Sequence, residues 1–186
     1  DCDPGYDDAA AIILAAGSPA VKIIALTTVA GNQTIEKVTS NALRIARLAG
    51  LSDIPIAMGA KRPLIRPAVE VCKEIHGVSG LDGADMPEAD IPLDPRPAAQ
   101  LIVDTIMREP EGTVTLVPTG PLTNIALAAR LEPRIVSRVK EVVLMGGACK
   151  EGNVSPCAEF NIENDPDRLQ RTLEGDDGGA RPYVPG

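Results

Sequence analysis

The sequence predicts an α/β fold in which helices cover both faces of an open, mostly parallel sheet. Three observations favour this fold class. Short runs of β-branched residues alternate with segments of helical periodicity, as they do in βαβ units. The 186 residues suit one domain or a piece of a larger one, and 44% of them are hydrophobic, which suffices for a core. Polar, glycine-bearing segments follow several predicted strands, where open α/β sheets place their ligands.

The expected elements follow one another along the chain. The apolar run at 9–16 predicts a helix, and the run at 21–29, Val-Lys-Ile-Ile-Ala-Leu-Thr-Thr-Val, predicts a buried strand. Residues 34–49 carry apolar side chains on one helical face, and Gly50 ends that helix. The remaining expected elements are a strand at 54–57, a helix at 98–107, a strand at 113–117, a helix at 123–130 and a strand at 141–145.

Two segments lack this periodicity. Residues 61–97 are rich in Pro, Gly and Asp, and they are too long for an ordinary connection, so we expect a functional loop or lid. Residues 165–167, Asp-Pro-Asp, predict a helix start. Residues 174–186 form an atypical tail rich in turn-forming residues. We therefore expect one α/β domain at 1–173, incomplete at both ends, followed by this tail.

The first eight residues, Asp-Cys-Asp-Pro-Gly-Tyr-Asp-Asp, place four carboxylates around a Pro-Gly turn before a helix. Four like charges this close repel one another unless a cation lies among them, and oxygen ligands favour Ca²⁺ or Mg²⁺. A solvated acidic loop at a helix N-terminus is the alternative.

Other polar segments, at 31–32, 118–120 and 146–147, each follow a predicted strand. A strand before Asp1 would place all four segments at one edge, and its absence suggests N-terminal truncation.

Composition excludes several classes of protein. The formal net charge of −8 argues against a protein that binds nucleic acid through its phosphates. No run of about 18 or more apolar residues predicts a membrane span. The cysteines form no Cys-x-x-Cys pair, so we expect reduced thiols in a cytoplasmic protein rather than a zinc site or a disulfide framework. They are Cys2, Cys72, Cys149 and Cys157.

Six motifs carry a family resemblance. They are the opening eight residues, Gly-Asn-Gln-Thr at 31–34, Ile-His-Gly at 75–77, Leu-Val-Pro-Thr-Gly-Pro-Leu-Thr-Asn at 116–124, Val-Leu-Met-Gly-Gly at 143–147 and Ala-Glu-Phe-Asn at 158–161. In this order they resemble the inosine–uridine-preferring nucleoside hydrolases, over residues 1 to about 173. The resemblance implies a Rossmann-like nucleoside hydrolase fold and hydrolysis of the N-glycosidic bond of ribonucleosides to ribose and free base.

The resemblance also implies a site. Ca²⁺ would bind Asp3, Asp8 and the backbone carbonyl of Thr119, and Asp3 would act as general base on a water molecule. His76, the only histidine, would approach the nucleobase by stacking or proton donation, or is incidental to its loop. The expected substrate contacts are Asp7, Asn32, Met145, Asn153, Glu159, Phe160 and Asn161. Turn formation is the alternative for the asparagines at 32 and 153, and core packing for the methionine.

The sequence departs from the family in one respect. The family's C-terminal part supplies a further Asp ligand preceded by a His, and no match to that pair exists here. The alternative is therefore a truncated, inactive fragment or pseudo-enzyme that at most binds metal or ribose, and we expect these 186 residues alone to hydrolyse nucleosides poorly. An Asp-nucleophile phosphatase is a weaker alternative. An EF-hand is excluded because Ile12 stands where its loop needs Glu.

For the intact parent protein, the resemblance implies a small nucleoside as substrate and a role in purine and pyrimidine salvage. It also implies a homo-oligomer. The base that is preferred does not follow from the residues.

Overall fold

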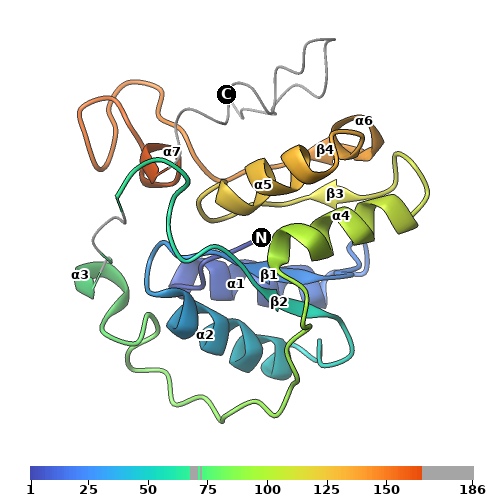
Figure 1. Cartoon of the computed structure of the whole chain (residues 1–186). Helices are drawn as coiled ribbons and strands as arrows, with labels where there is room; N and C mark the ends of the chain where they lie inside the picture. The colour runs from blue at the N-terminus through green and yellow to red at the C-terminus, as the bar shows by residue number, and fades with distance from the viewer. Residues whose placement is uncertain (68–70, 72, 165–186) are drawn as a thin grey trace.

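Two pairs of parallel strands lie at the centre of the molecule (Figure 1). The structure is a computed structural model that describes residues 1–67, 71 and 73–164. Strand β1 (Leu26–Thr28) pairs with β2 (Ile56–Met58), and β3 (Thr115–Leu116) pairs with β4 (Glu141–Val142). The parallel pairing and the alternation with helices confirm the predicted α/β class.

The first residues of the chain join the two strand pairs. Cys2 forms a parallel bridge with Thr28 in β1. On the other side, the amino group of Asp1 donates to the Val117 carbonyl (3.0 Å), and the Thr119 amide donates to the Asp1 carbonyl (2.8 Å). The opening segment therefore lies between β1 and the end of β3, and the acidic turn starts at the edge where both strands end.

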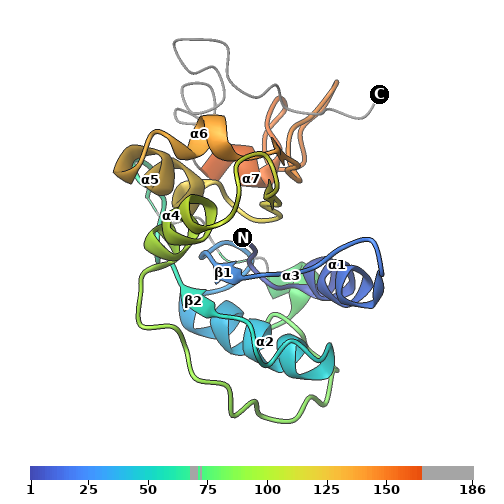
Figure 2. The same cartoon turned by 90° about the vertical axis from the view of Figure 1, so that its right-hand side faces the viewer.

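Helices cover both sides of the central strands, as Figure 2 shows. Helix α2 packs against β1 and β2 beside α1, and this side holds an apolar cluster that includes Ile12, Ile45 and Ile56. Helix α4 packs on the same strands from the other side, against α5 and α6. The bounds are α1 Tyr6–Gly17, α2 Ile35–Leu48, α4 Ala98–Arg108, α5 Thr123–Leu131 and α6 Ile135–Arg138.

The predicted long helices are confirmed to within a few residues, but the predicted strands are too long. Only Leu26–Thr28 of the expected strand 21–29 is paired, and Val21 is 51% exposed. An apolar run alone does not make a strand, because each strand residue needs a partner for its backbone groups. The expected strands at 113–117 and 141–145 shorten to two residues each, although backbone hydrogen bonds from Val143 to Leu116 and from Met145 to Pro118 continue the contact between the two segments.

Three short helices and several regions fall outside the sequence prediction. Helices α3 (Lys73–His76), α6 and α7 (Phe160–Asn164) have four or five residues, too few to show a period. Segment 61–97 is otherwise irregular in its described part, as expected. The predicted helix start at 165–167, the tail at 174–186 and Cys72 lie outside the described residues. No helix in the described part is long and apolar enough to cross a membrane.

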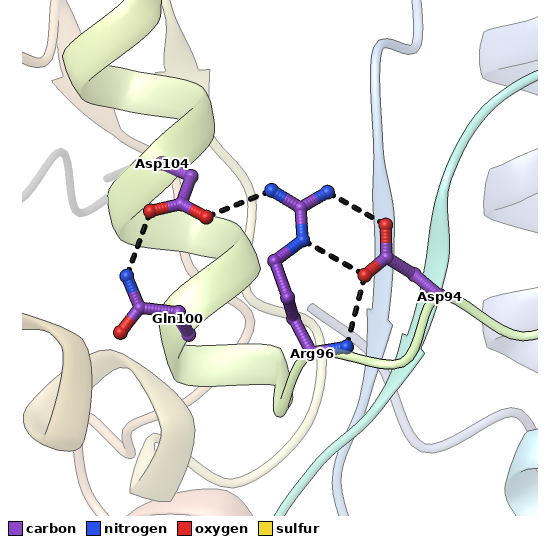
Figure 3. A network of polar contacts seen from close by, with 4 residues as sticks. All are labelled: Asp94, Arg96, Gln100 and Asp104. Carbon is purple, nitrogen blue, oxygen red and sulfur yellow. Dashed lines mark hydrogen bonds and ion pairs between the residues drawn. The ribbon is translucent and has the colours of Figure 1, made fainter.

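Arg96 ties the end of the long irregular segment to α4 (Figure 3). Its guanidinium donates to both carboxylate oxygens of Asp94 (2.8 and 2.6 Å) and to Asp104 (2.8 Å). The Asp94 amide donates to the Ile56 carbonyl (2.8 Å), so the cluster joins α4 to β2. The hydrogen bonds from Arg96 lower the pKa of Asp94 to about 2.

We expect Arg96→Lys to lower the melting temperature by about 2–4 °C near neutral pH, because an ammonium cannot make the bidentate contact. The pKa of Asp94 lies below its ordinary value of 3.8, so this stabilisation is present above that pH and is lost as the pH falls toward 2. The difference in melting temperature between variant and unsubstituted chain should therefore shrink in acid. Thermal denaturation across this pH range measures it.

The matched control is Arg44→Lys. Arg44 forms an ion pair with Glu88 at 3.7 Å, and the Glu88 side chain is 93% exposed, so its loss should change little. Equal melting temperatures for the two variants at neutral pH would show that the Arg96 cluster does not anchor the segment.

Candidate active site

The acidic turn divides its carboxylates into buried and exposed groups. Asp3 and Asp8 are buried, with 1% and 4% of their surface exposed, whereas Asp7 is exposed on the first turn of α1. Within the described part of the chain, no Lys or Arg forms an ion pair with either buried carboxylate. Buried carboxylates are costly unless they are paired or coordinate a metal, so this pair is a candidate cation site.

Asp3 is held by the loop that follows β1. The Asn32 amide donates to Asp3 Oδ2 (2.8 Å), and Asn32 Nδ2 donates to the Asp3 carbonyl (3.1 Å). Two glycines leave room for the carboxylate: a Cβ at Gly31 would overlap Oδ2, and a Cβ at Gly120 would lie 2.6 Å from Oδ1. The carboxylate therefore lies directly against the backbone of the two loops that follow β1 and β3.

Asp8 is held by the loop that follows β3. The Thr119 hydroxyl donates to Asp8 Oδ1 (2.5 Å), and the Gly5 amide donates to Oδ2 (3.5 Å). The Thr119 carbonyl accepts a hydrogen bond from Asn161 Nδ2 (2.9 Å). Thr119 thus lies between the acidic turn and α7, and the structure brings together the three residues that sequence analysis assigns to Ca²⁺.

Burial shapes the electrostatics of this pair. It raises the pKa of Asp3 well above its ordinary value, and the charge of Asp8 raises it further. Burial also raises the pKa of Asp8, although the hydrogen bond from Thr119 opposes the shift. A bound cation would offset both effects, since opposite charge favours the ionised carboxylate.

The donor atoms fit a hard cation. Two carboxylates and the nearby Thr119 carbonyl offer only oxygen, which Ca²⁺ and Mg²⁺ prefer. In the described ranges, no group of three or more His, Cys, Asp or Glu side chains could hold a metal ion. These residues therefore supply part of a coordination sphere, and further oxygens would have to complete it.

A second group of predicted residues surrounds the start of α7. Asn161 Nδ2 donates to the Met145 carbonyl (3.1 Å) as well as to Thr119, and Asn161 is 5% exposed. Glu159 Oε2 accepts from the Gly147 amide (3.2 Å) and from the Asn161 amide (3.0 Å). Met145 itself is 48% exposed, so it is not a core residue in the structure described. These contacts join the end of the β4 segment to the Thr119 loop.

Asn153 belongs to the same group. Its Oδ1 accepts a hydrogen bond from the Phe160 amide (2.9 Å), at the first residue of α7. The Asn153 side chain therefore caps the segment that carries Glu159 and Asn161. The roles in substrate binding that sequence analysis assigns to these residues stay predictions.

His76 reaches the acidic turn from α3. It is buried, with 7% of its surface exposed, and its Nδ1 accepts a hydrogen bond from the Tyr6 amide (3.4 Å). The Tyr6 and His76 rings lie 5.5 Å apart, and a Cβ at Gly5 would lie 2.5 Å from Nδ1. In the neutral ring the proton is then on Nε2. The histidine packs beside α1, and its contact with a nucleobase stays a prediction.

Comparison with known proteins identifies the family. The sequence profile of the family described as "Inosine-uridine preferring nucleoside hydrolase" matches residues 1–180. The chain belongs to this nucleoside hydrolase family.

The relatives of this nucleoside hydrolase chain are longer proteins. It is similar to the inosine-uridine preferring nucleoside hydrolase of Leishmania major, with 55% identity over 168 residues that cover 90% of this chain and 53% of that protein. It is 50% identical over 167 residues to the pyrimidine-specific ribonucleoside hydrolase RihA of Shewanella woodyi, with the same coverage of both chains. The chain therefore spans about half the length of the curated relatives it matches.

Solved structures agree on the fold. The plant nucleoside hydrolase PpNRh1 superposes with a TM-score of 0.91 at 36% identity, over 100% of this chain and 58% of that one. The nucleoside hydrolase fold predicted from the motifs is confirmed.

Proposed function

We propose that the protein hydrolyses the N-glycosidic bond of ribonucleosides to ribose and free base, with Ca²⁺ at the acidic turn. The observation that carries this proposal is the buried Asp3–Asp8 pair, held against Thr119 where β1 and β3 end. Family membership supports the reaction class. The names of the two relatives differ in base preference, so the proposal covers ribonucleosides as a class.

The residues of the site suit the reaction. Ca²⁺, when bound, would supply positive charge that keeps the carboxylates ionised and orients water and ribose hydroxyls. Asp3 accepts the proton of the attacking water, and its position against two glycines limits its motion. Glycosidic cleavage passes through an oxocarbenium-like transition state and needs a water nucleophile and help for the leaving base.

Substrate positioning falls to the residues around the acidic turn and α7. Carboxylates and amides suit vicinal hydroxyls, and we assign ribose contacts to Asp7, Asn32, Asn153, Glu159 and Asn161. We assign Met145 and Phe160 to contacts with the bound nucleoside. His76, packed beside Tyr6, would approach the leaving base, where its Nε2 proton is available for donation.

A second candidate function is binding of metal or ribose without turnover. The sequence motivates it, because these 186 residues contain no match to the family's C-terminal His-Asp pair. Two measurements on the purified chain separate the candidates, calorimetric titration with Ca²⁺ and chromatographic assay of base release from inosine and uridine. Release that requires Ca²⁺ and stops with chelator supports hydrolysis. Ca²⁺ binding without base release supports the second candidate. If the chain shows neither Ca²⁺ binding nor base release, both candidates are excluded.

Gly31→Ala should weaken Ca²⁺ binding. The added Cβ would overlap the Asp3 carboxylate, which must then move away from the Asn32 amide. Gly17→Ala, where nothing lies within 4 Å of the added Cβ, is the matched control and should leave affinity unchanged. Calorimetry on both variants makes the comparison. Wild-type affinity in Gly31→Ala would show that the Asp3 carboxylate has no part in binding.

A further inference from the structure

Asn124, in the first turn of α5, joins the ends of β1 and β2 to Asp1 behind the candidate site. Its side chain is buried, with 1% of the residue exposed. Nδ2 donates to the Thr28 carbonyl at the end of β1 (2.8 Å) and to Asp1 Oδ1 (2.9 Å). Oδ1 accepts from the Ala60 amide, just beyond β2 (3.0 Å). Both kinds of polar atom in the amide are therefore used, and a carboxylate in its place would lack the donor.

Asp1 connects Asn124 to the residues assigned to Ca²⁺. The Thr27 hydroxyl donates to the same Asp1 Oδ1 (2.8 Å), so two side chains fix the carboxylate. The Asp1 carbonyl accepts from the Thr119 amide (2.8 Å), and the Thr119 hydroxyl donates to Asp8 (2.5 Å). Two residues after Asp1 the chain reaches Asp3. A displacement of Asp1 would therefore move both Asp3 and the Thr119 hydroxyl that donates to Asp8.

Gly59 packs directly against the Asn124 amide. A Cβ at Gly59 would overlap both atoms of the Asn124 amide group and the Thr28 carbonyl. The backbone of Gly59 thus lies so close to the Asn124 amide that only glycine fits at this position. Such close packing is expected where one side chain must hold several backbone segments in one geometry.

We propose that Asn124 is a positioning residue for nucleoside hydrolysis. It touches neither cation nor substrate, and acts by holding Asp1, and through Asp1 the Thr119–Asp8 contact, in the arrangement that receives Ca²⁺. This inference rests on the proposed function of the site.

The test compares Asn124→Ala with Ile125→Ala. Ile125 is the next residue of α5 and is 6% exposed, so its truncation loosens the same helix without removing a hydrogen bond to the strand ends. In Asn124→Ala, Ca²⁺ affinity and kcat should each fall by about 10–100-fold, the range for groups that orient metal ligands. At saturating Ca²⁺ the KM for nucleoside should change little, because the side chains assigned to ribose are retained. Asn124→Asp, which lacks the donor, should resemble Asn124→Ala.

Hydrogen exchange at the Thr119 amide adds a readout that needs neither Ca²⁺ nor turnover. This amide donates to Asp1, so it should exchange faster in Asn124→Ala than in Ile125→Ala. Equal exchange in the two variants, or equal losses of Ca²⁺ affinity and kcat, would overturn the positioning role. If neither the unsubstituted chain nor its intact parent protein binds Ca²⁺ or releases base, the proposed function fails and the role in hydrolysis fails with it. Exchange at Thr119 would still show separately whether Asn124 controls the Asp1 contact.

Discussion

In the intact parent protein, Asp3→Asn should lower the rate of nucleoside hydrolysis by about 10²–10⁴-fold, the usual contribution of a general base. An amide has nearly the same shape as the carboxylate, and its oxygen can still accept the hydrogen bond from the Asn32 amide. It cannot take a proton from water. The fold should persist, because replacing a buried charge by a neutral group removes a desolvation cost. Base release at saturating nucleoside and Ca²⁺ measures the effect.

Asp53→Asn is the control for the loss of one negative charge. Asp53 is exposed and lies between α2 and β2, away from the acidic turn in the sequence. The rate of nucleoside hydrolysis by Asp53→Asn should therefore be unchanged. The melting temperature of Asp3→Asn without Ca²⁺ should be no lower than that of the unsubstituted chain. A rate for Asp3→Asn that matches the control would remove Asp3 from the role of base.

Asp8→Ala should weaken Ca²⁺ binding by at least about 100-fold, since loss of a group that only orients a ligand already costs 10–100-fold. The substitution removes one of two buried carboxylates at the turn. Thr119→Val separates two contributions, because it removes the hydroxyl that donates to Asp8 and keeps the main-chain carbonyl. We expect a smaller loss for Thr119→Val than for Asp8→Ala. Calorimetric titration of both variants with Ca²⁺ measures these losses. Equal Ca²⁺ affinity in Asp8→Ala and in the unsubstituted chain would contradict the proposed site.

The sequence carried enough information for the long helices and for the edge that holds the candidate site. The period of α2 buries Val38, Ala42 and Ile45 on one face, and helical periodicity of this kind is a local property. The strand-end rule for parallel sheets anticipated that the acidic turn would lie beside the segment at 118–120, where Thr119 donates to Asp8. Strand length was overestimated at 21–29, because pairing depends on partners elsewhere in the chain.

Other features depend on contacts that no local pattern encodes. Asn124 stands at the start of α5, where a polar residue is unremarkable in the sequence. Its partners come from residues 1, 28 and 60, so its role becomes visible only when these segments meet. The contact of His76 with Tyr6 likewise spans 70 residues and was not predicted. In both cases burial distinguishes the residue, and the sequence alone does not indicate that burial.

The pairing of Asp1 with the loop after β3 has a consequence for folding. The Thr119 hydroxyl lies 3.4 Å from the Asp1 carbonyl across 118 residues of chain. Contacts of such large sequence separation form slowly, because the entropy of closing the intervening chain must be lost before they stabilise anything. Helices α1 and α2 can form early from local contacts, but the pair of carboxylates at the start of α1 acquires its final surroundings only when β3 docks. We therefore expect the cation site to be among the last parts of the molecule to become native during refolding.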